Sequence, residues 1–329
     1  MAETIATVTA AQPRSCAFYT GIRLLVSLGL VAALAIVSTV KAQPPAAARP
    51  PVIDMHVHST NVTPAQELAT MRAANIRFIW LASLATDLGA WAAALDSSQY
   101  LPSLTLPCPG GRAAFIERRC WDGTADFPDL AWLHAEAQAG RVRALGEAIP
   151  QYLGVAPNDA RLEPFWQLAE ELDLPVALHM GPGPPFAAYD ESPLPFTFPE
   201  FRMAANDPLL LEEVLLKHKR LRLLVMHAGW PFRDSMLALL YAHPNVYVDV
   251  GALQAEFMVP RPSYYAHLRS IVDAGFGKRI VFGSDFSNQV LPGIDAIATA
   301  EFLSAEQKAD ILCNNAARFL RLDAAVCAP

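Results

Sequence analysis

Residues 52–58 read V-I-D-M-H-V-H, a short apolar segment with a polar residue at every second position. In an extended strand alternate side chains point to the same face, so the sequence predicts that Asp54, His56 and His58 share one face. Two imidazoles at positions i and i+2 can bind a single metal ion. A His-x-His pair also occurs by chance on protein surfaces, so a metal site needs support from other parts of the chain.

Four further apolar segments each end in one titratable residue, at the point where a buried strand would emerge from the core. These residues are Glu147 in V-R-A-L-G-E, His179 in P-V-A-L-H, His227 in R-L-L-V-M-H and Asp285 in R-I-V-F-G-S-D. Imidazole and carboxylate groups are common ligands of divalent metals, so these segments supply that support.

From Val52 onward, short apolar segments alternate with amphipathic ones, which indicates strands alternating with helices. The predicted strands are Val52–His58, Arg77–Ser83, Tyr100–Pro107, Val142–Ile149, Pro175–Met180, Arg222–Ala228, Val246–Ala252 and Arg279–Phe286. The predicted helices are Pro64–Ala74, Asp87–Leu95, Asp129–Ala139, Asp159–Leu172, Pro208–Lys219, Pro231–His243, Pro262–Ala274 and Ser304–Arg321. This order is typical of an α/β fold, a single-domain (β/α)8 TIM barrel. A doubly wound open sheet is the alternative, but no G-x-G-x-x-G or G-x-x-x-x-G-K-[ST] motif follows any predicted strand.

In such a barrel, the carboxyl ends of the strands form the face that carries the active site. We therefore expect the side chains at these ends to converge: His56, His58, Glu147, His179, His227 and Asp285. The other histidines lie in helix patterns or at helix ends and are predicted to be surface or packing residues: His134, His218, His243 and His267.

The composition suits one large globular domain, because 53% of the 329 residues are hydrophobic and only 17% are charged. The formal net charge is −7, and no basic cluster is longer than Lys217–Arg222. Nucleic acid is therefore not an expected partner.

The amino terminus predicts export. Arg14 and Arg23 precede an apolar run from Leu24 to Val40, and the small-x-small pattern Val40-Lys41-Ala42 suits cleavage after Ala42. Residues 1–42 are therefore predicted to be a signal peptide that directs the barrel to the periplasm or outside the cell. The apolar run has 17 residues, so an uncleaved membrane anchor with the barrel outside the cytoplasm is the alternative. Residues 43–51, Q-P-P-A-A-A-R-P-P, predict a stiff linker. The barrel is expected to span residues 52–322, with residues 323–329 as a carboxyl-terminal tail.

Cleavage would remove Cys16 and leave an even number of cysteines. In an exported protein these permit two disulfides, and the local pairs Cys108–Cys120 and Cys313–Cys327 would close short loops. Neither spacing matches a C-x-x-C motif, so thiolate metal binding is not expected. Buried free thiols are the alternative, because connectivity cannot be read from a sequence.

Together these motifs resemble the amidohydrolase superfamily, specifically its amidohydrolase-related (amidohydrolase 2) branch, over Val52 to Leu322. In that family the metal centre is formed by a first-strand D-x-H-x-H, by histidines ending strands five and six, and by an aspartate ending strand eight. The matching residues here are His56, His58, His179, His227 and Asp285. The segment C-N-N-A-A-R-F-L, residues 313–320, also resembles the last helix of the family.

Imidazole nitrogen and carboxylate oxygen suit Zn²⁺, with Mn²⁺ as an alternative, and a catalytic centre must keep one position for water. Asp285 can both ligate the ion and accept a proton as water attacks a carbonyl, then pass that proton to the leaving group. A structural salt bridge is the other reading of Asp285. Gly283 and Ser284 leave room beside it, however, and the sequence offers no cationic partner.

Glu147 bears on the number of ions. In binuclear members of the superfamily, strand four supplies a carboxylated lysine or a glutamate that bridges two ions, and Glu147 stands in the matching place. None of the five lysines of the chain ends a strand at the active face. With a glutamate bridge, one ion would be held by His56, His58 and Asp285, and the second by His179 and His227.

In mononuclear members, His179 joins the first ion, while His227 polarises the substrate or positions the water. Glu147 would then contact the substrate or a ligand histidine. The resemblance slightly favours this arrangement, because members of this branch commonly work with one metal.

The substrate must fit the long loops after strands three and five, which carry aromatic residues and arginines. We expect a small organic molecule with a carboxylate, bound by Arg202, Trp230 and Arg233. The alternative is that the aromatic side chains pack the loops on the barrel and that Arg233 only begins a helix.

Three functions remain open. The leading hypothesis is an exported metal-dependent hydrolase acting on an ester, lactone or amide of a small molecule, with Asp285, His227 and Glu147 in catalysis. A metal-dependent non-oxidative decarboxylase is the alternative, because the resembling branch includes such enzymes. A non-catalytic binding protein would require a lost ligand residue, and none is missing. The sequence makes no prediction of oligomeric state, and it predicts membrane contact only if the amino-terminal segment stays uncleaved.

Overall fold

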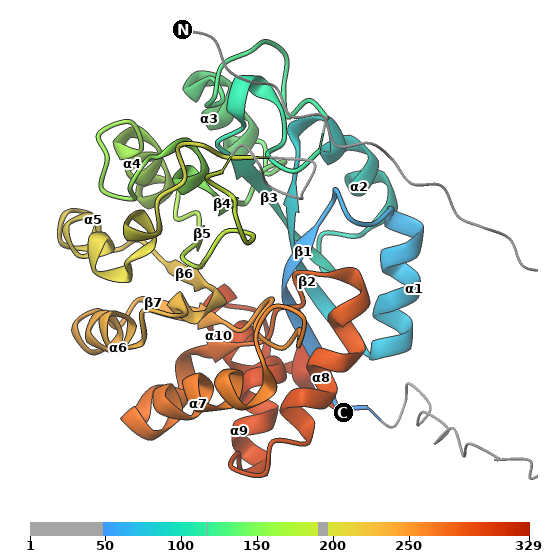
Figure 1. The fold of residues 1–329 in the computed structure, drawn as a ribbon. Helices are drawn as coiled ribbons and strands as arrows, with labels where there is room; N and C mark the ends of the chain where they lie inside the picture. The colour runs from blue at the N-terminus through green and yellow to red at the C-terminus, as the bar shows by residue number, and fades with distance from the viewer. Residues whose placement is uncertain (1–48, 117, 190–196) are drawn as a thin grey trace, which may run out of the picture. The chain divides into compact units, whose positions relative to one another are not determined.

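The computed structural model describes residues 49–116, 118–189 and 197–329 (Figure 1). The predicted signal peptide or anchor, residues 1–42, lies outside the described residues, as does most of the predicted linker. At the described end of that linker, Arg49 is 9% exposed and its guanidinium lies 3.2 Å from Asp295 Oδ1. Within the described ranges, no helix combines the length and hydropathy needed to cross a membrane.

The strands form one parallel sheet in sequence order, as predicted. They are β1 (Val52–His58), β2 (Ile76–Ser83), β3 (Tyr100–Leu106), β4 (Ala144–Ala148), β5 (Val176–His179), β6 (Leu223–Met226), β7 (Val246–Asp249) and β8 (Ile280–Val281). Two backbone hydrogen bonds join β1 to the segment after β8: Met55 N donates to Phe282 O at 2.9 Å, and Asp285 N donates to His56 O at 2.8 Å. The (β/α)8 TIM barrel is therefore confirmed.

Helices surround the strands (Figure 1). They are α1 (Pro64–Ala74), α2 (Leu88–Ala94), α3 (Leu130–Gln138), α4 (Glu163–Glu171), α5 (Glu212–Lys217), α6 (Arg233–Ala242), α7 (Arg261–Ile271), α8 (Val290–Ala298), α9 (Ala305–Ala309) and α10 (Asn315–Leu320). Local chemistry sets the ends of α1. Thr63 and Gln66 form a capping box, Pro64 occupies the first turn, and Asn75 ends the helix with a left-handed φ of 55°.

Helix α8 is absent from the sequence prediction. Its sequence, V-L-P-G-I-D-A-I-A, contains Pro and Gly, which usually interrupt helices. Pro292 lies in the first turn, where a missing N–H is tolerated. Val290, Ile294 and Ile297 are buried, so packing on the barrel overrides the weak local preference.

The predicted last helix, Ser304–Arg321, is divided. A π-helical turn at Asp310–Asn314 separates α9 from α10. Ile311 O accepts a hydrogen bond from Phe282 N at 2.8 Å, so this irregular turn supplies an acceptor to the segment after β8. The eighth strand is therefore shorter than the predicted Arg279–Phe286, because β8 spans only Ile280–Val281. The residues after it bond to β1 and to the π-helical turn.

The prediction that Asp54 shares one face of the strand with His56 and His58 is wrong. The β1–β2 register shifts between Asp54 and Val57, where three residue steps on β1 match two on β2. Ile53 and Met55 pack in the barrel interior, whereas Val57 packs with residues from the strands and the surrounding helices. A β-bulge therefore changes the phase of alternation, so that His56 and His58 face inward while Asp54 faces the helix layer.

One apolar cluster, with residues from seven strands and α10, fills the interior of the barrel at the amino-terminal ends of the strands. Within it, the rings of Trp80 and Phe319 stack with centroids 6.5 Å apart. A larger cluster lies between the strands and the helices. The opposite end of the interior, at the carboxyl ends of the strands, is left to polar groups.

Candidate metal centre

The first half of the site comes from β1 and the turn after β8. His56 Nε2 and His58 Nε2 lie 3.1 Å apart, and His58 Nε2 lies 3.2 Å from Asp285 Oδ1. Asp285 has a left-handed φ of 62° and is held by the hydrogen bond from its N–H to His56 O. The backbone of β1 therefore directs the Asp285 carboxylate toward the two imidazoles.

The second half comes from the ends of β5 and β6. His227 Nε2 lies 3.0 Å from His179 Nδ1. His227 Nδ1 lies 2.9 Å from Gly251 O, a main-chain acceptor, so this nitrogen carries a proton and donates it to that oxygen. The main-chain oxygen of His179 accepts a hydrogen bond of 2.5 Å from Gln151 Nε2, which fixes the end of β5.

Glu147, at the end of β4, joins the two halves. Its Oε2 lies 3.3 Å from His58 Nε2 and 3.6 Å from His56 Nε2. Its Oε1 lies 2.9 Å from His179 Nδ1 and 3.4 Å from His227 Nε2. Each oxygen of one carboxylate thus faces a different pair of histidines.

The structure brings all the predicted strand-end residues together and adds Asp249, at the end of β7. Asp249 Oδ2 lies 2.9 Å from His56 Nδ1, and Asp249 Oδ1 accepts the N–H of His227 at 2.8 Å. The sequence prediction missed this residue because it extended the seventh strand to Ala252, which placed Asp249 in mid-strand. The same rule that found the other residues, an apolar run ending in a titratable group, applies to V-Y-V-D once the strand ends at Asp249.

The charges in this cluster depend on one another. Burial opposes a charge on His56, but the carboxylates of Asp285, Asp249 and Glu147 raise the pKa of His56 well above its usual value. Burial would raise the pKa of Glu147, yet the charge on His56 and hydrogen bonds from His179 and His227 lower it well below the usual range. Burial likewise opposes the charge on Asp285, but His56 and His58 lower the pKa of that carboxyl. The Glu147 and Asp285 carboxylates therefore stay ionised.

These residues fit a divalent metal. Three groups within the described chain bring candidate ligand atoms within 4.8 Å of one another: His56, His58 and Glu147; Glu147, His179 and His227; and His56, His227 and Asp249. Buried carboxylates need compensating positive charge, which protons on the imidazoles or bound cations can supply. The donor set, nitrogen and oxygen without thiolate, suits Zn²⁺ or Mn²⁺.

Aromatic side chains lie beside the second half of the site. The Tyr152 ring meets the His179 ring edge-on, with centroids 5.4 Å apart, and also contacts Phe198 and Phe201. Phe115, from the loop after β3, packs edge-on against Tyr152. These residues form an apolar wall next to His179.

Both predicted disulfides are present, Cys108–Cys120 and Cys313–Cys327. The first ties together the loop that carries Phe115. Within this loop Cys120 O accepts a hydrogen bond from Thr86 N, and Arg118 pairs with Asp87. The loop is thus joined to the segment after β2.

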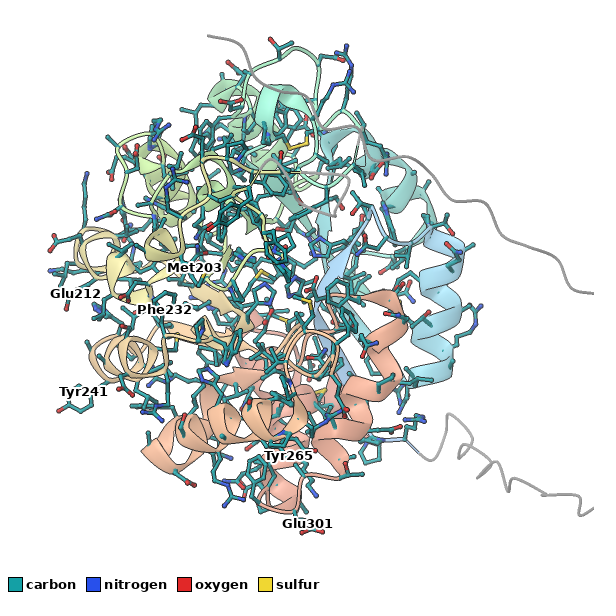
Figure 2. The ribbon with its side chains drawn as sticks, viewed as in Figure 1. Met203, Glu212, Phe232, Tyr241, Tyr265 and Glu301 are labelled. Atoms are coloured by element: carbon teal, nitrogen blue, oxygen red, sulfur yellow. A yellow bond between two sulfur atoms is a disulfide. The ribbon has the colours of Figure 1, made fainter. Side chains whose placement is uncertain are left out.

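The three predicted substrate-binding residues lie in two places. Trp230 and Arg233 line a cavity of about 490 Å³ that also includes His267, between the start of α6 and the start of α7. Arg233 pairs with its neighbour Asp234, and its side chain is 57% exposed. Arg202 instead donates to the main-chain oxygens of Pro199 and Phe201. Phe232, which is labelled in Figure 2, directly precedes Arg233, the first residue of α6.

The sequence profile of the amidohydrolase family matches residues 53–322. No curated protein matches the chain at a significant level. Among solved structures, 5-carboxyvanillate decarboxylase from Sphingomonas paucimobilis is 14% identical, with a TM-score of 0.54 over 84% of this chain and 99% of that one. A protein assigned as a 2-pyrone-4,6-dicarboxylic acid hydrolase from Pseudomonas putida is 15% identical, with a TM-score of 0.54 over 82% and 97%. Dihydroorotase from Campylobacter jejuni is 15% identical, with a TM-score of 0.53 over 84% of each chain.

At these identities the solved structures establish a shared fold, and their reactions are of more than one kind. The family profile carries more weight, because it extends from β1 to the end of the last helix. On that match, the chain belongs to the amidohydrolase family and is an enzyme.

Proposed function

We propose that the protein is a metal-dependent hydrolase with two adjacent divalent-metal positions, occupied by Zn²⁺ or by Mn²⁺. The observation that carries this proposal is the placement of Glu147, whose Oε2 faces His56 and His58 while its Oε1 faces His179 and His227. A carboxylate that only contacted substrate would have no need to meet both histidine pairs. The geometry thus favours the two-ion arrangement over the one-ion arrangement that the family resemblance slightly preferred.

The residues have distinct roles in this scheme. One ion would be held by His56, His58 and Asp285, and the other by His179 and His227, with Glu147 offering one carboxylate oxygen to each. Divalent ions, when bound, polarise a carbonyl and lower the pKa of water into the neutral range. Asp285 is ionised, and its side chain is 14% exposed, so it can accept the proton of the attacking water and deliver it to the leaving group.

The substrate in this proposal is an ester, lactone or amide of a small carboxylated molecule. A flat apolar part of the substrate would pack beside His179 against an apolar wall. This wall is formed by Phe115, Tyr152, Phe198 and Phe201. Arg233 and Trp230, at the cavity after β6, are the proposed partners for a substrate carboxylate.

Decarboxylation is the second candidate, because a structure of the same fold is named 5-carboxyvanillate decarboxylase. One experiment separates the reactions. Purified protein is screened against lactones, esters and hydroxybenzoates in ¹⁸O-labelled water. Hydrolysis places solvent oxygen in the product and acidifies weakly buffered medium. Release of carbon dioxide without label in the product would reject the hydrolase proposal.

The metal requirement is tested on the same preparation. Chelator-stripped protein should lose activity and regain it with Zn²⁺ or Mn²⁺. Full activity in protein shown by elemental analysis to be metal-free would refute the requirement.

We further propose that the barrel works outside the cytoplasm after cleavage at Ala42. The disulfides Cys108–Cys120 and Cys313–Cys327 support this location, because such bonds persist in oxidising compartments. Mature protein should begin at Gln43 and contain no titratable thiol. A chain that still begins near Met1 and sediments with membranes would favour the anchor instead.

A further inference from the structure

We propose that Asp249 is a positioning residue that fixes the protonation of His56 and the backbone of His227 together. The inference rests on the proposed metal centre, since it concerns how two of its histidines are held. In this role Asp249 keeps a proton on His56 Nδ1, so that Nε2 is the nitrogen that would ligate a metal ion.

The contacts of Asp249 use both carboxylate oxygens. Oδ2 accepts a hydrogen bond from His56 Nδ1 at 2.9 Å. Oδ1 accepts from His227 N at 2.8 Å and from Gly251 N at 2.9 Å. Asp249 and His56 are both fully buried, so water does not compete for these bonds. A carboxylate oxygen is an acceptor, and Oδ1 already accepts from two N–H groups, so the His56–Asp249 bond places a proton on His56 Nδ1.

The His227 turn needs an external support. His227, Ala228 and Gly229 have successive left-handed φ values of 56°, 48° and 62°. Non-glycine residues seldom adopt this conformation, so the surrounding structure must hold it in place. Asp249 holds the first of the three through the His227 N–H, and His267 Nε2 bonds to Ala228 O at 2.9 Å.

The surrounding backbone leaves the His56 ring little freedom. A Cβ atom at Gly251 would lie 2.5 Å from His56 Nδ1, and a Cβ atom at Gly283 would lie 2.6 Å from His56 Cβ. The imidazole is therefore enclosed between two glycines, with Asp249 at its Nδ1 edge. Reorientation of the ring cannot replace a lost hydrogen bond.

Asp249 also lies near enough to His56 and His227 to be a metal ligand itself. Its hydrogen bonds argue against that role. Oδ1 already serves two N–H groups and Oδ2 faces the protonated side of His56, away from the Nε2 atom that meets His58 and Glu147.

The test is Asp249→Asn, which nearly preserves volume. The amide oxygen can still accept from His227 N and Gly251 N, but the amide NH₂ would meet His56 Nδ1. A donor facing this nitrogen requires it to be an acceptor, so the His56 proton must move to Nε2 and block ligation. Asp310→Asn is the matched control, because Asp310 is a buried aspartate that binds Lys278 and Asn314 instead.

Two readouts are used on metal-free and Zn²⁺-loaded full-length protein. The first is the ¹⁵N-bound proton of His56 Nδ1 by NMR, assigned by its absence in His56→Asn. The second is Zn²⁺ affinity by competition with a chelator. We expect wild-type and Asp310→Asn protein to show the Nδ1 proton, and Asp249→Asn to lose it and bind at least one Zn²⁺ about 10- to 100-fold more weakly.

A retained Nδ1 proton in Asp249→Asn, or equal loss of Zn²⁺ affinity in Asp310→Asn, would overturn the proposal. If Asp249→Asn did not fold, the wild-type spectrum would still decide, because a neutral His56 protonated at Nε2 contradicts the proposal directly. The spectra of metal-free protein test the role of Asp249 even if wild-type protein bound no metal. That second result would refute the proposed function but not the role of Asp249.

Discussion

The amino-terminal end of the barrel interior is filled with apolar side chains, whereas the carboxyl-terminal end is filled with titratable ones. At the first end, Trp80 and Phe319 stack and are almost wholly buried. At the second, Glu147 and Asp249 are buried with three histidines, whereas His58 and Asp285 are partly exposed, and His179 Nε2 has no hydrogen-bond partner in the described structure. Burial stabilises the first end and opposes the charges of the second. The fold thus supports a site whose buried carboxylates need positive charge, from protons on the imidazoles or from bound cations.

The strongest test of this contrast is Asp285→Asn at the site. The amide cannot accept the proton and supplies no negative ligand, so turnover should fall by roughly a hundred- to ten-thousand-fold. The fold should persist, because the Asp285 N–H to His56 O bond is a main-chain contact. Steady-state kinetics and thermal unfolding measure the two effects. A variant that kept more than a tenth of wild-type turnover would remove Asp285 from catalysis.

Phe319→Ala makes the reverse change at the apolar end. Removing a buried phenylalanine ring should reduce the free energy of unfolding by about 3–5 kcal/mol. Bound metal per folded chain should be unchanged, because Phe319 contacts Trp80 and Tyr247 rather than the site. Tyr241→Ala is the control, since that side chain points outward from α6 in Figure 2 and is 86% exposed. Denaturant unfolding and elemental analysis would show whether a change at the apolar end alters stability without altering metal binding.

A pH-dependent effect is expected at Glu67, which lies in α1 and is 2% exposed. Burial, with a further contribution from Asp54, raises the pKa of Glu67 from 4.5 to about 8. The folded state therefore holds this proton more tightly than the unfolded state. Its contribution to stability is fully present below about pH 4.5 and is lost as pH rises to about 8, at up to about 1.4 kcal/mol per pKa unit.

Glu67→Gln should remove this loss. Its melting temperature should equal that of wild-type protein near pH 4.5 and exceed it above pH 8, by up to roughly 10–20 °C. Glu213→Gln, on the exposed face of α5, is the control and should follow wild-type protein at both pH values. If the difference in melting temperature between wild-type and Glu67→Gln protein did not change over this pH range, ionisation of buried Glu67 would not destabilise the fold.

Much of this arrangement could be predicted from the sequence, because strand ends in a parallel barrel meet at one face. His56, His58, Glu147, His179, His227 and Asp285 follow from that rule alone. The rest depended on tertiary structure. Three features are set by neighbours distant in sequence, which local patterns do not report. They are the bulge that turns Asp54 away, the short β7 that ends at Asp249 and the packing that stabilises α8. The division of Glu147 between two histidine pairs likewise requires coordinates.

The metal stoichiometry of active wild-type protein tests the central claim, that Glu147 joins two metal positions, most directly. Elemental analysis after Zn²⁺ loading and removal of free metal should give two ions per chain. His227→Asn, which removes a ligand from one position only, should give one. A single ion in fully active wild-type protein, with His227→Asn unchanged in metal content, would contradict the two-position centre.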